Sequence, residues 1–314
     1  MGNYAIAIHG GAGRLMTGAL TSEQQKAFND KLSEALQIGY AILTSGGTSV
    51  DAVEATVRVL EDSPLFNAGK GSVFNCEGVN EMDAAIMNGK NLKAGAIAAV
   101  RTIRNPVSCA RAVMEKSAHV LLAGAGAEKF AQECGIEIVP PSYFYDEERH
   151  QHWLATKDTE GASWAGDTYS TSSEVPEKKL GTVGAVALDS TGNLAAATST
   201  GGINNKKFGR VGDSPIIGAG TYANNKTCAV SCTGEGEYFI RQSIAYDISA
   251  LMEYKGLTVS QAATEAIKKV AQLGGEGGLV AIDNQGNIVA PFNTSSMFRG
   301  WINSQGEKFT GIFR

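Results

Sequence analysis

The sequence predicts a layered α+β fold, and two features of the C-terminal half carry that prediction. From about residue 181 onward, strand-like apolar runs come first, then two helical segments, and then strand-like runs again. The strands are joined by short turns of hairpin composition instead of strand–helix–strand crossovers. This order favours layered α+β packing over a doubly wound parallel sheet.

Helix and strand signals place the elements of the N-terminal half. Thr21 begins a capping-box signature before apolar residues at helical spacing, and glycines at 46 and 47 end that helix. Pro64 follows a second helical stretch. We expect, in order, a strand at 4–8, a glycine turn at 9–13, helices at about 22–45 and from 48 or 49 to before 64, strands near 81–88 and 94–100, a helix after 106, and a strand near 119–123 that leads to another helix.

Beyond residue 157 the pattern changes twice. Apolar periodicity disappears between about 158 and 179, which predicts a polar, flexible linker. The segments 181–200 and 278–290 then share the pattern Gly-x-Val-Ala-x-Asp-x-x-Gly-Asn, so we expect two equivalent hairpins in a sheet built from β-meander units. Helical spacing between them predicts helices at 236–254 and 258–273.

Composition and charge exclude several classes of protein. Of 314 residues, 43% are hydrophobic and 19% charged, which allows a large core and excludes wholesale disorder. The net charge is −5 and Lys and Arg are scattered, so we expect no nucleic-acid partner. The first residues lack a basic region and no apolar run could span a bilayer, so we expect a cytoplasmic protein with no membrane partner. Five widely spaced cysteines argue against a disulfide framework.

Common catalytic and nucleotide-binding motifs are missing. The glycine pattern at 218–223 is not followed by a helix signal, and the glycines at 10–13 lack the Lys-Ser/Thr pair of a phosphate-binding loop. The histidines are His9, His119, His150 and His152, and we expect the last two to be solvated beside the linker. The sequence has no His-Glu-x-x-His or Gly-x-Ser-x-Gly motif.

The junction between Gly181 and Thr182 indicates another chemistry. A threonine hydroxyl is a weak nucleophile that needs a base, and chain cleavage before the threonine would supply its own α-amine in that role. An α-amine has a pKa of about 7.7 to 8.0, so it accepts a proton near neutral pH. The simpler alternative is that Thr182 only begins a strand.

Three polar clusters in the C-terminal half favour the catalytic interpretation. Hydroxyls at 198–200 end the return strand of the first hairpin, beside the strand that starts at Thr182. Arg210 and Asp213 lie in a glycine-rich turn, where they suit the carboxylate and ammonium of a zwitterion; the alternative is an internal ion pair between them. The segment 231–237 forms a strand-to-helix turn whose N–H groups can face a developing oxyanion.

The motif set as a whole resembles the isoaspartyl peptidases, also called plant-type L-asparaginases, which are N-terminal nucleophile hydrolases, and it looks like a bacterial member. The resemblance covers essentially the whole chain. Its segments are Ile-His-Gly-Gly-Ala-Gly at 8–13, Pro-Leu-Phe-Asn-Ala-Gly at 64–69, Glu-Met-Asp-Ala at 81–84, Leu-Lys-Ala-Gly at 92–95, Arg-Asn-Pro at 104–106, Gly-Thr-Val-Gly-Ala-Val at 181–186, Ala-Thr-Ser-Thr-Gly-Gly at 197–202, Gly-Arg-Val-Gly-Asp-Ser-Pro at 209–215, Cys-Thr-Gly-Glu-Gly-Glu at 232–237 and Pro-Phe-Asn-Thr at 291–294.

The resemblance implies one N-terminal nucleophile hydrolase domain over residues 1–314, folded as an αββα four-layer sandwich. It implies an inactive precursor that cleaves itself between Gly181 and Thr182. The fragments 1–181 and 182–314 would stay together as an α/β pair, and two pairs would form a dimer. The implied substrates are small molecules, namely β-aspartyl dipeptides and L-asparagine, hydrolysed through a β-aspartyl ester on the threonine.

The resemblance also assigns roles to individual residues and implies no cofactor for catalysis. The matches are Thr182 as nucleophile and base, Thr200 as the hydroxyl that orients it, Thr233 and the Gly234 N–H as the oxyanion hole, and Arg210, Asp213, Gly236 and Asn67 as substrate contacts. A structural sodium site made of backbone carbonyls matches the loop residues Leu60, Glu61, Ser63, Phe66, Ala68 and Lys70.

Two alternatives stay open. Glycosylasparaginases share the segments at 198–202 and 210–215, but their cleavage site is of the His-Asp-Thr type, whereas this chain has Leu-Gly-Thr at 180–182. A non-catalytic amino-acid-binding module would use Arg210 and Asp213 alone. That module would not explain a linker that runs directly into Gly181 and Thr182.

Overall fold

The computed structural model describes residues 3–158 and 181–314, and it confirms the α+β class. The described strands form an eight-stranded sheet in the order β12-β11-β1-β5-β6-β2-β3-β4 and a four-stranded sheet in the order β10-β9-β8-β7. Their bounds are β1 Ala5–Gly13, β2 Met82–Asn88, β3 Ala94–Val100, β4 Leu121–Ala123, β5 Val183–Leu188, β6 Leu194–Thr200, β7 Thr221–Ala223, β8 Cys228–Gly234, β9 Gly277–Asp283, β10 Ile288–Val289, β11 Ser296–Ile302 and β12 Lys308–Phe313.

Several helices begin where the sequence offers capping groups. Thr21 caps the first helix with the expected capping box, in which its side chain accepts the Gln24 N–H, and Thr48 caps the second. Pro106 lies in the first turn of the third helix, where its missing N–H is not needed. The helix bounds are α1 Ser22–Thr44, α2 Ser49–Glu61, α3 Pro106–Lys116, α4 Gly124–Glu133, α5 Glu147–Thr156, α6 Gly236–Gln242, α7 Ile244–Lys255 and α8 Val259–Gln272.

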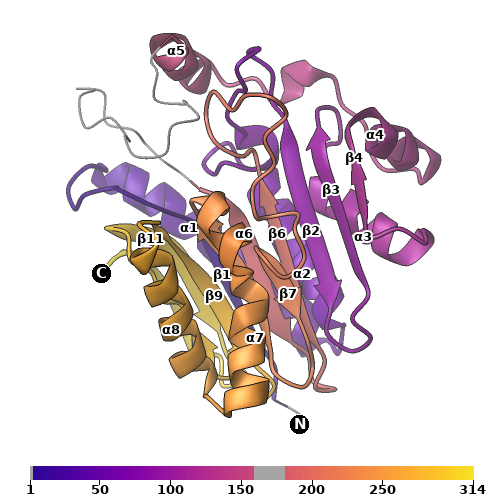
Figure 1. Cartoon of the computed structure of the whole chain (residues 1–314), viewed down its shortest axis with the longest axis vertical. Coiled ribbons are helices and arrows are strands. Elements are labelled where there is room, and N and C mark those ends of the chain that lie inside the picture. The colour runs from indigo at the N-terminus through magenta and orange to yellow at the C-terminus, as the bar shows by residue number, and fades with distance from the viewer. Residues whose placement is uncertain (1–2, 159–180) are drawn as a thin grey trace.

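The two sheets face each other, and helices pack on their other sides (Figure 1). Between the sheets lies one apolar cluster, in which Val186 of β5 joins Ala229 of β8 and Val280 of β9. Helices α1, α2 and α3 pack on the eight-stranded sheet, whereas α7 and α8 pack on the four-stranded sheet. Strands β1 and β5 are buried along their whole length, as expected for strands with both faces covered.

Both predicted hairpins form, but they do not lie in one sheet. β5 pairs with β6 inside the eight-stranded sheet, with Gly184 opposite Thr198. β9 pairs with β10 at the edge of the four-stranded sheet. The prediction of a single sheet of β-meander units is therefore wrong. The shared sequence pattern specifies the turn within each hairpin. It does not determine which distant strands pair with that hairpin.

Some elements differ from the prediction or were not predicted. The helix expected over 236–254 is divided into α6 and α7 at Ser243, whose φ of 48° interrupts the helical backbone. Helix α5 and strands β7, β11 and β12 were not predicted from the sequence. The predicted linker at 158–179 lies outside the described residues, apart from Asp158.

His150 is half-buried and not fully solvated as predicted. It lies on α5, where its ring contacts the rings of Phe74, Tyr145 and Trp153, and its Nδ1 atom is buried. His152, on the same helix, is half-buried. The sequence did not reveal this packing because α5 folds back over Phe74, which is distant in sequence, and local polarity does not indicate that contact.

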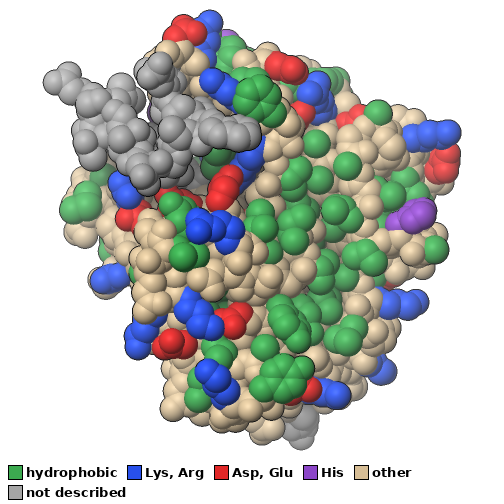
Figure 2. Space-filling model, in the orientation of Figure 1, with side chains coloured by type: hydrophobic (Ala, Val, Ile, Leu, Met, Phe, Trp, Pro, Cys, Tyr) green, Lys and Arg blue, Asp and Glu red, His purple; other side chains and the backbone are tan. Residues whose placement is uncertain are grey.

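The molecular surface carries charges of both signs. On the face shown in Figure 2, basic and acidic side chains are interspersed, and apolar side chains gather where Figure 1 places β2 and β3. Within the described part of the chain, we find no helix with the length and apolar character needed to cross a bilayer.

Candidate active site

The hydroxyls of Thr182 and Thr200 meet at one end of the β5–β6 hairpin. Thr182 directly precedes β5 and Thr200 ends β6, so antiparallel pairing brings both residues to the same edge. The Thr182 Oγ1 donates to the Thr200 Oγ1 at 3.0 Å, and both residues are buried. The Gly202 N–H donates to the same Thr200 oxygen at 3.0 Å. Thr200 is thus held by the turn that follows it, and it orients the side chain of Thr182.

Glycines allow the predicted cleavage site to pack against the end of β1, which continues to Gly13 as a bulged strand where a glycine turn at 9–13 was predicted. Gly11 has a φ of 109°, and a Cβ added there would overlap the backbone of Gly181. A Cβ added to Gly181 would lie 2.9 Å from the Thr233 Oγ1. This close approach explains why both positions lack a side chain, and it places Gly181 beside the hydroxyl of Thr233.

The end of β8 presents the predicted oxyanion-hole residues. Thr233 is fully buried, and its Oγ1 accepts the Ala12 N–H at 3.2 Å, so its own hydrogen can be donated to another acceptor. Gly234 follows with a φ of 140°, a conformation that favours glycine. A hydroxyl donor therefore lies next to Gly181.

Arg210, Asp213 and Gly236 lie together, but Arg210 pairs with Glu237 rather than with Asp213. The Arg210 guanidinium donates two hydrogen bonds of 2.9 Å to the two carboxylate oxygens of Glu237. A Cβ at Gly236 would lie 2.7 Å from the Asp213 Oδ1 and 3.1 Å from the Arg210 Nη2. Glycine at this position therefore leaves room for the cation and the anion side by side.

Asp213 is a buried carboxyl group that lacks a full set of partners. Its Oδ2 atom is buried and accepts no hydrogen bond from the described residues. Burial raises the pKa of Asp213 to about 6, although the positive charge of Arg210 opposes this rise. Because a desolvated carboxylate gains most from a cation, the site favours a ligand with an ammonium group.

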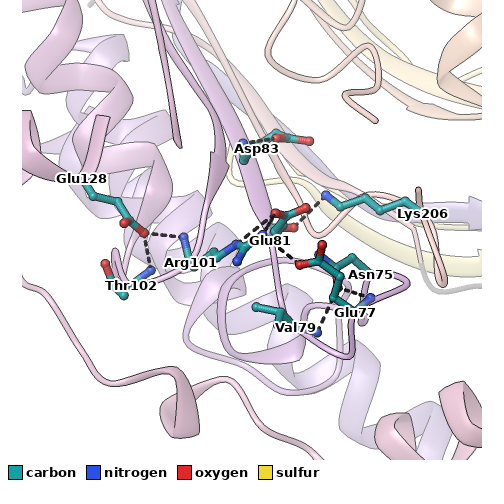
Figure 3. Close-up of polar contacts among 10 residues, drawn as sticks. Asn75, Glu77, Val79, Glu81, Asp83, Arg101, Thr102, Glu128 and Lys206 are labelled. Carbon is teal, nitrogen blue, oxygen red and sulfur yellow. Dashed lines mark hydrogen bonds and ion pairs between the residues drawn. The ribbon is translucent and has the colours of Figure 1, made fainter. Parts of the chain in front are cut away.

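A second group of charges includes Glu81, Asp83 and Lys206 (Figure 3). Asp83 of β2 is directly opposite Thr200 of β6 in the sheet, and its side chain is fully buried. Lys206 is buried as well and donates to the Glu81 carbonyl at 3.0 Å. Burial raises the pKa of Asp83, while the charges of Lys206 and Arg210 oppose the rise. The positive charges of Lys206 and Arg210 thus favour the ionised form of the buried Asp83 on β2.

Sequence reasoning gave no role to three charged residues of this region, Asp83, Lys206 and Glu237. Asp83 and Glu237 belong to segments that carry the family resemblance, so their motifs could have marked them as site residues. Lys206 lies outside all of these segments. Their neighbours come from β2, β6, α6 and the loop after β6, and linear spacing does not connect these segments.

Asn67 supports the turn after Thr200. Its Nδ2 donates to the Gly202 carbonyl at 2.6 Å, and its Oδ1 accepts the Val73 N–H at 3.1 Å. The Gly201 N–H donates to the Asn67 carbonyl at 3.0 Å. Both the donor and the acceptor of the Asn67 side-chain amide thus bond within the protein and stabilise the turn after Thr200. The contact of Asn67 with substrate stays a prediction.

The six residues of the predicted sodium loop run from the end of α2 to the 3₁₀ turn Gly69–Gly71. A Cβ at Gly69 would overlap the Glu61 carbonyl oxygen, and one at Gly71 would overlap the Phe66 carbonyl oxygen. Gly69 and Gly71 thus pack directly against backbone carbonyl oxygens of this loop. The Lys70 ammonium lies over the Tyr143 ring, 5.4 Å from its centroid. Among described residues, no cluster of three or more acidic, histidine or cysteine side chains could hold a metal.

An oriented threonine hydroxyl beside a cation and an anion has the form of an amidohydrolase site. The family model described as asparaginase matches residues 2–312, and the chain belongs to that family. The isoaspartyl peptidase of Escherichia coli (strain K12) is 49% identical over 315 residues, which cover 100% of this chain and 97% of the relative. The isoaspartyl peptidase of Salmonella typhimurium is 48% identical, with 100% of both chains covered. The isoaspartyl peptidase/L-asparaginase of Mus musculus is 46% identical over 94% of this chain and 86% of the relative. The resemblance inferred from the motifs is confirmed.

Proposed function

We propose that this protein hydrolyses β-aspartyl dipeptides and L-asparagine with Thr182 as an N-terminal nucleophile. Membership of the asparaginase family makes the chain a hydrolase, and its relatives are named isoaspartyl peptidase or isoaspartyl peptidase/L-asparaginase. The observation that carries the proposed mechanism is the 3.0 Å hydrogen bond from the Thr182 Oγ1 to the Thr200 Oγ1. It supplies an oriented hydroxyl at the residue that self-cleavage would turn into an N-terminus.

The proposed precursor first cleaves itself. The Thr182 hydroxyl attacks the carbonyl carbon of Gly181, the peptide C–N bond breaks as the acyl group moves to oxygen, and water hydrolyses the resulting ester. The products are a carboxylate on Gly181 and a free amine and hydroxyl on Thr182. The nearness of the Thr233 Oγ1 to Gly181 supports this step, because a hydroxyl donor there stabilises the oxyanion.

The proposed fragments 1–181 and 182–314 stay associated after cleavage. Strand β1 pairs with β5, and β2 pairs with β6, so each of these pairs contains one strand from either side of the cut. The apolar cluster under α1 and α2 also contains residues of both parts, including Ile8 and Ala185. Separation would expose this core to water at a large cost in free energy.

The mature enzyme repeats the chemistry on its substrate. The Thr182 amine accepts the hydroxyl proton as the oxygen attacks the side-chain amide carbon of the substrate, and Thr233 with the Gly234 N–H donates to the oxyanion. The ammonium of Thr182 returns the proton to the leaving amine, which departs and leaves a β-aspartyl ester. Water, deprotonated by the same amine, then releases aspartate. Arg210 binds the α-carboxylate, and Asp213 binds the α-ammonium.

The finer architecture belongs to the same proposal. The two facing sheets with helices on their outer sides support a single domain of the αββα four-layer type found in N-terminal nucleophile hydrolases.

Two cleaved pairs form a dimer, and exposed apolar side chains beside β3 and β4, namely Leu92, Val120 and Leu121, offer surface for a second copy. The cytoplasmic location rests on sequence alone.

The loop from Leu60 to Lys70 is proposed to bind sodium through backbone carbonyls. The tight packing of Gly69 and Gly71 against carbonyl oxygens supports this assignment. The ion would stiffen the loop that carries Asn67, and therefore the turn after Thr200, without taking part in the chemistry.

Denaturing gel electrophoresis and a substrate panel test the proposal together. We expect two fragments of 181 and 133 residues, and aspartate release from β-Asp-Leu and L-asparagine. Hydrolysis of aspartyl-glucosamine alone would assign a glycosylasparaginase. An intact chain that binds aspartate without hydrolysing any substrate would instead indicate a binding module.

A further inference from the structure

His9 is a buried histidine in direct contact with the nucleophilic residue, and the proposed mechanism does not use it. It is fully buried in β1, and its Nδ1 lies 3.0 Å from the carbonyl oxygen of Thr182. Its Nε2 lies 2.9 Å from the Ser231 Oγ on β8. A carbonyl oxygen only accepts hydrogen bonds, so the Nδ1 atom must carry a hydrogen.

The hydrogen on the His9 Nδ1 determines which neighbouring groups donate and which accept. Burial lowers the pKa of His9 to about 3, although its bond to Thr182 opposes the shift, so the ring is neutral and Nε2 is an acceptor. Ser231 must then donate to Nε2. Thr198 lies 2.7 Å from the Ser231 Oγ and must donate to it. Thr221 donates to Thr198 at 2.6 Å, and its hydroxyl also lies 3.0 Å from the Ser214 carbonyl oxygen. The hydrogen bonds therefore run in one direction, from β7 to the Thr182 carbonyl.

The packing around His9 is built for this chain of hydrogen bonds. His9 is opposite Gly184 in the β1–β5 pair, two residues beyond Thr182. A Cβ added at Gly184 would overlap the Ser231 Oγ and would lie 2.5 Å from the His9 Nε2. Only glycine at 184 allows the His9 imidazole in the eight-stranded sheet to reach Ser231 in the four-stranded sheet. This contact explains why the segment after Thr182 carries a glycine at that position.

We propose that His9 is a positioning residue that holds the carbonyl of Thr182 and thereby sets the direction of its amine and hydroxyl. This proposal rests on the proposed function, in which Thr182 becomes an N-terminus. Cleavage removes the peptide bond before Thr182, so the residue is then attached covalently on its carbonyl side alone. A hydrogen bond that fixes the carbonyl fixes ψ of Thr182, and with it the position of the amine relative to the sheet.

The first test measures the tautomer and needs no catalysis. In protein labelled with ¹⁵N-histidine, we expect one imidazole to show the neutral form protonated at Nδ1 and to keep it from pH 5 to 9. The signal is assigned by its loss in His9→Asn, since the chain has four histidines. A His9 signal from the Nε2-protonated or the charged form would overturn the proposal.

The second test separates the Thr182 contact from the Ser231 contact. In His9→Asn the amide nitrogen occupies the place of Nδ1 and can still donate to the Thr182 carbonyl, whereas in His9→Gln the amide reaches toward Ser231 instead. We expect His9→Asn to keep kcat for β-Asp-Leu within about tenfold, and His9→Gln to lower kcat about 100-fold at a similar KM. Equal losses in the two variants, or an effect on KM alone, would contradict a positioning role.

A control distinguishes this proposal from the proposed function. If Thr182→Ala stays active, the nucleophile itself is wrongly assigned. If Thr182→Ala is inactive while the two His9 variants behave alike, only the role of His9 is wrong. Should both His9 variants fail to fold, replacing His119, His150 and His152 by Gln leaves His9 as the one labelled histidine, and its tautomer still decides the outcome.

Discussion

The Arg210 guanidinium and the Glu237 carboxylate form a two-point ion pair where the substrate α-carboxylate is proposed to bind. The Arg210 side chain is 16% exposed, whereas that of Glu237 is 56% exposed. Burial alone would raise the pKa of Glu237, but its hydrogen bonds with Arg210 hold this pKa below the usual value. A substrate carboxylate must therefore share Arg210 with Glu237 or displace it.

We expect Glu237→Gln to lower the KM for β-Asp-Leu by up to about tenfold with little change in kcat, because a neutral amide competes less well for Arg210. Steady-state kinetics measure this effect. Asp247→Asn is a matched control, since it removes the partner of Lys269 between α7 and α8. A higher KM in Glu237→Gln would show that Glu237 orients Arg210 instead of competing with the substrate.

Arg210 itself should matter for turnover and not for self-cleavage, because a free α-carboxylate exists only on the incoming substrate. We expect Arg210→Ala to lose turnover of zwitterionic substrates while it still folds and cleaves. Arg210→Lys should lower kcat/KM by about 10- to 100-fold, the equivalent of roughly 1.5 to 3 kcal/mol for charge-assisted hydrogen bonds. Full kcat/KM in the lysine variant would mean that bidentate recognition is the wrong explanation.

Gly236→Ala should disable the substrate site without preventing folding. The added Cβ would lie 2.7 Å from the Asp213 Oδ1, and the carboxylate and Arg210 would have to move apart. We expect a loss of about 100-fold in kcat/KM with normal self-cleavage. Gly126→Ala is the control, because the space around this α4 glycine is open and alanine is the better helix former. Unchanged kinetics in Gly236→Ala would contradict the arrangement of the site.

The pKa of Asp213 near 6 predicts a pH dependence that is specific to the ammonium group of the substrate. Below pH 6 the carboxyl is protonated and no longer attracts a cation, so kcat/KM for β-Asp-Leu should fall by a further factor of about ten per pH unit, beyond the loss caused by protonation of the Thr182 amine. The succinyl analogue keeps the α-carboxylate but lacks the ammonium, and it should show only the titration of the Thr182 amine. Identical pH profiles for both substrates would remove Asp213 from ammonium binding.

The Asp213 carboxyl should also make the free energy of unfolding depend on pH. This free energy should fall as pH rises, whereas kcat/KM rises with pH. Its pKa is raised above the usual 3.8, so between about pH 4 and 6 the unfolded chain ionises while the folded chain does not. We expect its contribution to the free energy of unfolding to fall as pH rises through this window and to stay level above it. Urea unfolding of wild type and Asp213→Asn measures the difference, and an unchanged slope in the variant would contradict the assignment.

Much of the fold could be predicted because its signals are local. The capping box at Thr21 fixed the start of α1, and the shared turn pattern located both hairpins. The hairpin also brought Thr182 and Thr200 together, since antiparallel pairing alone brings the two ends of the segment to one edge.

Other parts depend on contacts between distant segments. The placement of the hairpins in two sheets, the packing of His150 on Phe74, and the pairing of Arg210 with Glu237 instead of Asp213 all involve partners that linear spacing does not identify. A charged pair three residues apart indicates a binding chemistry, but the geometry of the turn decides which anion the arginine meets.

The proposed mechanism requires Thr182 as the nucleophile of both self-cleavage and turnover, and variants of this residue test that role directly. Thr182→Ser should cleave and turn over at a reduced rate, because the methyl group that restricts χ1 is lost. Thr182→Ala, expressed and analysed on a denaturing gel with an assay for aspartate release from β-Asp-Leu, should give one uncut chain of 314 residues and no activity. Two fragments, or measurable aspartate release, from Thr182→Ala would contradict the account.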